Sequence, residues 1–136
     1  MHEQMKKLIL LLLFIPLVFS CDKEGNDPLI YSIEGKWLWS PSENRADANT
    51  MYEFVDGVRY TYYCNTCPAD DAYWNSLDKS DRLPRTNPYT FENNTLTVDL
   101  HHGNELVVLI TFECGGGKLL MDGQFSHLWR LSSDCN

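Results

Sequence analysis

The chain has 136 residues, a length typical of a single domain. It carries 11 Lys and Arg against 19 Asp and Glu, and the net charge of −8 argues against nucleic-acid binding, which needs a positive surface. An aromatic content of 12% with a mean hydropathy of −0.33 excludes a disordered chain and a polytopic membrane protein. Five cysteines in so short a chain favour an oxidising compartment.

Residues 1–20 have the pattern of a secretory signal peptide, in which two lysines precede an apolar run at 8–19. That run is too short for a transmembrane helix, which needs about 20 apolar residues. The segment ends in Leu-Val-Phe-Ser-Cys, which resembles a bacterial lipobox. The resemblance implies a lipoprotein whose mature N-terminus is Cys21, modified with palmitate or similar chains. The alternative is an ordinary signal peptide, with Cys21 free to form a disulfide.

The residues that follow Cys21 have no apolar periodicity, so 21–32 are interpreted as lipid anchor and tether. Their acidic character resembles the surface-export signals of Bacteroidota lipoproteins, although solvated tether residues would have the same composition. Two or more acyl chains are enough for stable membrane anchoring. We therefore expect a cell-envelope protein held by its N-terminal lipid, on the periplasmic or surface face of the outer membrane.

The third segment, 33–136, contains short runs in which apolar residues recur with period two, the pattern of antiparallel strands. The expected strands are Lys36–Ser40, Met51–Val55, Val58–Cys64, Tyr89–Glu92, Thr95–His101, Glu105–Glu113, Lys118–Asp122 and Phe125–Leu131. The turns between them hold residue pairs that tolerate positive φ, namely Asp56-Gly57, Asn93-Asn94, Gly103-Asn104 and Asp122-Gly123. One helical turn is expected within 70–79. The pattern predicts an all-β, eight-stranded antiparallel up-and-down barrel, with an open β-sandwich as the alternative.

Gly35-Lys36-Trp37 at the first strand and Arg130 in the last strand resemble the Gly-x-Trp signature and the tryptophan-covering arginine of lipocalin-like domains. The chain thus resembles a bacterial lipocalin-like lipoprotein of Bacteroidota type. The resemblance implies a lipocalin-like barrel with one end closed by an arginine stacked on the tryptophan. It also implies an open mouth that carries the long connections, here 41–50 and 65–88.

The strand order predicts at which end of the barrel each of the four cysteines after the anchor lies. Cys64 and Cys67 lie at the mouth, whereas Cys114 and Cys135 lie at the closed end. A strand separates the ends by about 20 Å, and bridged Cα atoms lie within about 7 Å. We therefore predict disulfides Cys64–Cys67 and Cys114–Cys135. Redox use of the Cys-x-x-Cys pair and a structural zinc site are the less favoured alternatives, because no βαβ unit and no second Cys-x-x-Cys pair accompany it.

Alternation along the strands predicts a barrel interior crowded with aromatic side chains, which leaves little room for a large ligand. The predicted inward residues are Trp37, Trp39, Tyr52, Phe54, Val58, Tyr60, Tyr62, Leu96, Val98, Leu100, Leu106, Val108, Ile110, Phe112, Leu119 and Met121, joined by either Phe125 and Trp129 or Leu128.

Neither catalysis nor metal binding is expected. His101 and His102 are adjacent, so on a strand they point to opposite faces, and a metal site with His127 would need the loop to fold back. The sequence contains no Ser-His-Asp order, no phosphate-binding glycine loop and no paired catalytic carboxylates. We therefore expect a binding protein rather than an enzyme, with no cofactor.

A small apolar or amphipathic ligand at the barrel mouth is the favoured function. The residues expected to bind it are Tyr60, Tyr62, Tyr73, Trp74 and Tyr89, with Arg85 as the polar group that orients it. Arg82 and Arg85 would either meet an anionic head group or, as the favoured interpretation, pair with neighbouring carboxylates. The alternative function is a filled barrel whose long loops contact an envelope protein, as an inhibitor or an assembly module.

Overall fold

The structure is a computed structural model that describes residues 31–66 and 70–136. The predicted signal peptide, the lipidation site Cys21 and the predicted disulfide partner Cys67 lie outside the described residues. The strands are β1 (Gly35–Trp39), β2 (Thr50–Val55), β3 (Val58–Tyr63), β4 (Asn87–Glu92), β5 (Thr95–His101), β6 (Asn104–Glu113), β7 (Lys118–Met121) and β8 (Ser126–Arg130). The helices are α2 (Asp71–Ser76) and the 3-10 turns η2 (Arg45–Asp47), η3 (Lys79–Asp81) and η4 (Cys114–Gly116).

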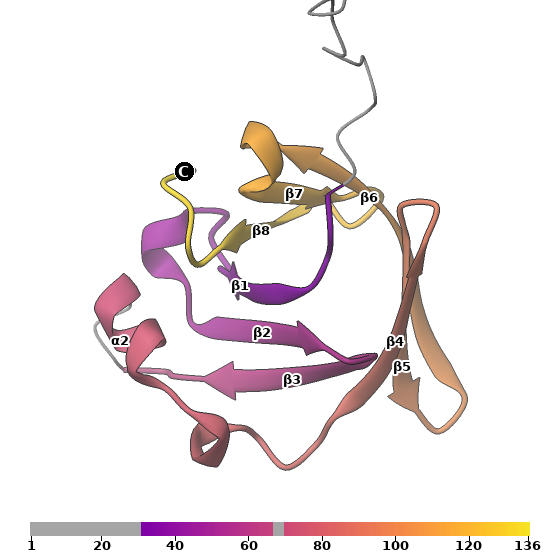
Figure 1. The fold of residues 1–136 in the computed structure, drawn as a ribbon, viewed down its shortest axis with the longest axis horizontal. Helices are drawn as coiled ribbons and strands as arrows, with labels where there is room; N and C mark the ends of the chain where they lie inside the picture. Colours follow the sequence, from indigo (N-terminus) through magenta and orange to yellow (C-terminus); the bar gives the residue numbers. More distant parts are fainter. Residues whose placement is uncertain (1–30, 67–69) are drawn as a thin grey trace, which may run out of the picture. The chain divides into compact units, whose positions relative to one another are not determined.

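The eight strands form one closed antiparallel barrel in the order β1 to β8. Each strand pairs with the next along the chain, and β8 returns to β1 with Trp37 opposite Arg130. Figure 1 shows this meander, with the long connection between β3 and β4 carrying α2. All the predicted strands are present, and closure confirms the lipocalin-like barrel over the open sandwich. None of the described helices is long and apolar enough to cross a membrane.

Two hairpin turns explain why the meander forms. Asp56 and Gly57 have φ of 50° and 77°, and Asn93 and Asn94 have φ of 50° and 58°. Positive φ at both central residues matches the right-handed twist of the flanking strands, and Asp, Asn and Gly adopt it at low cost. The predicted turn at Gly103-Asn104 is shifted by one residue, because Asn104 already pairs with His101 in the β5–β6 ladder.

Large apolar side chains fill the barrel interior. The buried members of this inner core are Ile33, Trp37, Phe54, Leu96, Val98, Val108, Ile110, Leu119 and Leu128. Most are the residues that alternation predicts, and Leu128 rather than Trp129 is the inward residue of β8. Because these side chains pack against one another, the centre of the barrel is a packed core rather than a calyx.

A second core lies on the outer surface of the barrel, under α2. This outer-face cluster consists of the buried residues Leu38, Ala48, Met51, Tyr62, Trp74 and Leu131, with Tyr60, Cys64, Tyr73 and Leu77 packed against them. The helix begins at Asp70, whose carboxylate accepts a hydrogen bond from the Tyr73 amide at 2.8 Å. Trp74, fully buried, anchors the helix to the strands. The predicted helical turn is confirmed, and it serves packing.

The prediction that Val58, Tyr60 and Tyr62 face inward is wrong. The two-residue turn at 56–57 places Arg59 opposite Phe54 and Thr61 opposite Tyr52. Cross-strand partners share a face, and Phe54 and Tyr52 belong to the inner core. The inward residues of β3 are therefore Arg59 and Thr61. Tyr60 and Tyr62, which alternate with them, belong to the outer-face cluster.

The closed end contains the predicted arginine–tryptophan pair. The Arg130 guanidinium lies 4.1 Å from the centre of the Trp37 ring. Its three nitrogens donate to the carbonyl oxygens of Gly116, Glu34 and Ser32, at 3.2, 2.9 and 2.8 Å respectively. Gly35 must lack a side chain here, since it has φ of 116° and a Cβ would lie 3.0 Å from the Arg130 Nη1. This arginine joins three segments that meet at the end of the barrel.

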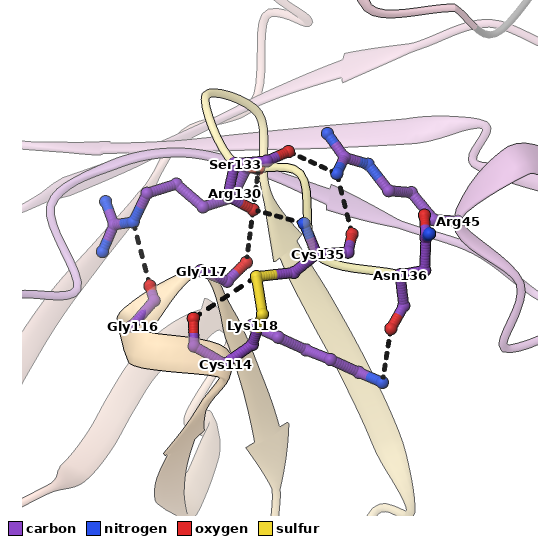
Figure 2. Close-up of a disulfide and its surroundings, with 9 residues drawn as sticks. All are labelled: Arg45, Cys114, Gly116, Gly117, Lys118, Arg130, Ser133, Cys135 and Asn136. Carbon is purple, nitrogen blue, oxygen red and sulfur yellow. Dashed lines mark hydrogen bonds between the residues drawn. A yellow bond between two sulfur atoms is a disulfide. The ribbon is translucent and has the colours of Figure 1, made fainter.

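The Cys114–Cys135 disulfide is confirmed, with a Cα–Cα distance of 6.2 Å. Figure 2 shows how it ties the C-terminal tail to the turn between β6 and β7. The tail passes so close that a Cβ on Gly117 would lie 2.4 Å from the Cys135 sulfur. Arg45 Nη1 also holds the tail, donating to the Cys135 carbonyl oxygen at 2.8 Å (Figure 2).

Cys64 is also disulfide-bonded. The Cys64–Cys67 pairing stays a prediction, because Cys67 lies outside the described residues.

Candidate functional site

A cavity opens where β3 and β4 separate. These strands share only two register pairs, Val58 with Pro88 and Arg59 with Asn87. Beyond them the connection takes the place of β4, and the Leu83 amide donates to the Thr61 carbonyl oxygen at 2.8 Å. The cavity formed there has a volume of about 310 Å³ and is called the mouth cavity below. It is lined by Tyr52, Arg59, Thr61, Leu83, Arg85, Asn87 and Leu100.

Arg59 extends from β3 into the mouth cavity. Its guanidinium carbon lies 4.6 Å from the centre of the Tyr52 ring, so one face of the guanidinium is covered by an aromatic side chain. Its Nη2 donates to Asn87 Oδ1 at 2.9 Å. Its Nε is buried and has no hydrogen-bond partner among the described residues. Burial lowers the pKa of Arg59, although a guanidinium stays charged in proteins.

Asn87 holds Arg59 in place. Only 5% of this residue is exposed, and its Nδ2 donates to the Asp99 carbonyl oxygen at 2.8 Å. That hydrogen bond orients the amide so that its oxygen is available to accept from Arg59. The arrangement fixes one guanidinium nitrogen and leaves the buried Nε without a hydrogen-bond partner in the part of the chain that the structure describes.

The rim of the mouth cavity combines apolar and cationic side chains. Leu83 and Leu100 are 42% and 38% exposed, so both present apolar surface to solvent at the rim. Arg85 is exposed and makes no ion pair with any described residue. A site with this lining offers apolar surface and positive charge to the same ligand.

The structure brings only one of the predicted ligand-binding residues to the mouth cavity, namely Arg85. Tyr60, Tyr62, Tyr73 and Trp74 come together, but in the outer-face cluster beneath α2. Tyr89 packs inside the barrel, with its ring edge-on to Phe54 at a centroid distance of 5.0 Å. Burial raises the pKa of the Tyr89 hydroxyl.

Arg82 and Arg85 differ in their partners. Arg82 Nη2 forms an ion pair with Glu53, and its Nε donates to the Tyr62 hydroxyl at 3.1 Å. The Arg82 guanidinium also lies over the Tyr60 ring, at 3.6 Å from the ring centre. The favoured expectation of pairing with a carboxylate is therefore confirmed for Arg82 and not for Arg85.

The three histidines of the described residues are not among the side chains that line the mouth cavity. His101 Nε2 lies 2.6 Å from the Thr86 carbonyl oxygen. His127 lies between two carboxylates, with Nδ1 2.7 Å from Glu43 and Nε2 3.5 Å from Glu113. Over residues 31–66 and 70–136, no group of three or more His, Cys, Asp or Glu side chains is placed to hold a metal ion.

A second cavity, of about 320 Å³, lies beside the C-terminus and is lined by Glu43, Asn44, Arg45, Ala46, Asp71 and Asn136. Its arginine is already engaged, since Arg45 Nη2 pairs with Asp71 at 3.2 Å. Its lining also contains no large apolar side chain. The mouth cavity is therefore the better candidate for binding an amphipathic molecule.

Sequence reasoning missed Arg59 as a site residue, together with every other lining residue except Arg85. The signal was present in the Asp56-Gly57 turn, since a two-residue hairpin pairs Phe54 with Arg59 and so places the arginine on the inward face. The alternation of tyrosines in Tyr60-Thr61-Tyr62 favoured the opposite assignment.

Searches of protein-family models, of curated proteins and of solved structures found no match to this chain.

Proposed function

We propose that the chain is a lipid-anchored protein of the cell envelope that binds a small amphipathic molecule in the mouth cavity. The observation that carries this proposal is the cavity of about 310 Å³ with leucines and arginines on one lining. Small-molecule sites are concave, mostly apolar and supplied with a few polar groups that fix orientation, in volumes of about 300–1,000 Å³. The packed inner core restricts the ligand to the mouth.

Native mass spectrometry of the protein, purified without denaturation from its own envelope, tests the proposal. We expect a stoichiometric extra mass that is lost on denaturation. The variant Thr61→Phe, which adds a ring to the cavity wall, should lose that mass. Thr90→Phe makes the same change at an exposed position and should keep it. The proposal fails if the extra mass is absent or is equal in both variants.

The anchor is tested separately, because it concerns residues outside those described. Labelling of producing cells with a palmitate analogue should modify the wild-type chain and not Cys21→Ser, and the variant should leave the membrane fraction. Labelling of both proteins, or of neither, would contradict lipidation at this cysteine.

A second candidate function is docking to an envelope protein through the outer wall of β6. Val107 and Leu109 face outward and are 60% and 51% exposed. Adjacent exposed apolar residues on a strand are typical of interaction surfaces. A photocrosslinking residue at position 109 should then give one discrete adduct in intact envelopes, and the same residue at position 90 should give none. Equal labelling at both positions would contradict this candidate.

A further inference from the structure

We propose that the mouth cavity selects ligands that carry a carboxylate, which binds along the edge of the Arg59 guanidinium. This inference rests on the proposed function and adds the chemical class of the ligand. The occupant is a small carboxylic acid with an aliphatic or aromatic body.

The first argument is the distribution of arginine partners. Arg45 pairs with Asp71 and Arg82 pairs with Glu53. Arg130 donates to three carbonyl oxygens. Among the described residues, Arg59 and Arg85 alone of the arginines have neither an ion pair nor a set of carbonyl acceptors, and both line the mouth cavity. A chain with 19 acidic residues has many that could have served as partners.

The second argument is the free energy of burial. A buried charge without a counter-ion destabilises the folded protein, and natural proteins rarely keep one without a reason. Arg59 is buried enough that desolvation lowers its pKa, and its Nε has no acceptor. An anionic ligand bound against the accessible part of the guanidinium would supply the missing counter-charge.

The third argument is shape. The Tyr52 ring covers one face of the guanidinium, and Asn87 accepts from Nη2. An incoming anion therefore meets the guanidinium along its edge, where parallel N–H donors match the two oxygens of a planar carboxylate. The exposed side chains of Leu83 and Leu100 provide the apolar surface for the body of the ligand.

Arg85 adds to the attraction from the rim. Because it is exposed, its contribution is screened by salt. Arg59 and Arg85 thus have separable roles. Arg59 determines the preference for a carboxylate, and Arg85 raises the affinity for any anion at low ionic strength.

Calorimetric titration of octanoate and 1-octanol, two probes that differ only in the head group, tests the inference on the full chain in lipid nanodiscs. Titrations into empty nanodiscs measure partition into lipid and are subtracted. We expect saturable binding of both probes, with octanoate about tenfold or more tighter, as hydrogen bonds to a charged group imply.

Three variants assign the effect. At high salt, where the attraction of the exposed Arg85 is screened, Arg59→Gln should reduce the preference for octanoate to about one, since it removes the charge and the forked donors. Arg85→Gln should reduce octanoate affinity by about threefold, and only at low salt. Lys79→Gln, which removes the same charge from an exposed position on the same connection, should change neither probe. Circular dichroism before titration verifies that each variant is folded.

The outcomes separate the two levels of the proposal. Equal, saturable binding of octanoate and 1-octanol by the wild-type protein would overturn the carboxylate inference and leave the binding function standing. An octanoate preference that survives in Arg59→Gln at high salt would also overturn it. Absence of saturable binding by either probe would overturn both. The comparison of octanoate with 1-octanol on the wild-type protein requires no variant. The inference can therefore be tested even if Arg59→Gln does not fold.

Discussion

Arg130 at the closed end and Arg59 at the mouth are stacked on aromatic rings in similar ways but are used differently. Their guanidinium carbons lie 4.1 Å from the Trp37 ring centre and 4.6 Å from the Tyr52 ring centre. Arg130 donates to three carbonyl oxygens, whereas Arg59 donates to one side chain and has a buried Nε with no partner within 31–66 and 70–136. The comparison teaches that stacking alone does not define a role. Arg130 uses its donors within the fold, whereas the guanidinium of Arg59 lines a cavity without a carboxylate partner among the described residues.

Arg82 provides an intermediate case on the outer surface. It is stacked on Tyr60, and its charge is neutralised by Glu53. The Tyr62 hydroxyl connects the two, since it donates to Glu53 at 3.1 Å and accepts from Arg82. Burial raises the pKa of Tyr62. This network fastens the β3–β4 connection to the barrel wall beside the mouth cavity.

The largest effect is expected at the disulfide of the closed end. Replacing Cys114 and Cys135 together by serine should lower the free energy of unfolding by about 3 kcal/mol, because the bridge restricts the unfolded chain. Its sequence separation is 21 residues. Urea unfolding followed by circular dichroism measures the loss. A change below about 1 kcal/mol would show that Arg45 and the turn hold the tail without the bridge.

Arg130→Met should cost about 2 kcal/mol, since it keeps much of the stem over Trp37 but leaves the carbonyl oxygens of Gly116, Glu34 and Ser32 without their donor. The same urea titration measures it. If the variant is as stable as the wild-type protein, the closed end does not depend on this arginine and the comparison with Arg59 fails.

Arg82→Gln should cost about 1 kcal/mol, because the ion pair that it removes is only partly exposed to water, with side-chain exposures of 16% and 17% for Arg82 and Glu53. High salt should lower the free energy of unfolding of the wild-type protein toward that of the variant. A double-mutant cycle of Arg82→Gln, Glu53→Gln and the double variant measures the interaction energy of this pair. An interaction energy near zero would contradict a stabilising ion pair.

Arg59→Met should change the free energy of unfolding least, by less than about 1 kcal/mol in either direction. It removes one hydrogen bond to Asn87 but also removes a buried charge that no described carboxylate neutralises. Thermal or urea unfolding without ligand measures this effect. A loss equal to that of Arg130→Met would mean that both arginines are structural, which would break the comparison.

Sequence reasoning reached the fold because the relevant signals are local. The strand positions follow from alternation, and Asp56-Gly57 and Asn93-Asn94 define hairpins through residues that tolerate positive φ. The Cys114–Cys135 bridge follows from which barrel end each strand terminus reaches. The stacking of Arg130 on Trp37 was anticipated from the resemblance of a short motif, and the structure shows the same contact.

The residues of the candidate site were harder to predict from the sequence, because alternation identifies an apolar face of a strand but not what covers that face. Tyr60 and Tyr62 can face outward because Trp74 and α2 cover them, and that contact joins segments separated along the chain. The partners of Arg82 and Arg85 are likewise decided by where the connection crosses the barrel wall.

The strands, the turns, the barrel and the closed end could therefore be predicted from the sequence, because all of them depend on near neighbours or on strand parity. Tertiary packing accounts for three further features: β3 and β4 separate after Arg59, a cavity forms there, and the Arg59 Nε has no hydrogen-bond partner among the described residues. The physical reason is that local periodicity and turn geometry are encoded residue by residue, whereas an unsatisfied donor depends on every segment packed around it.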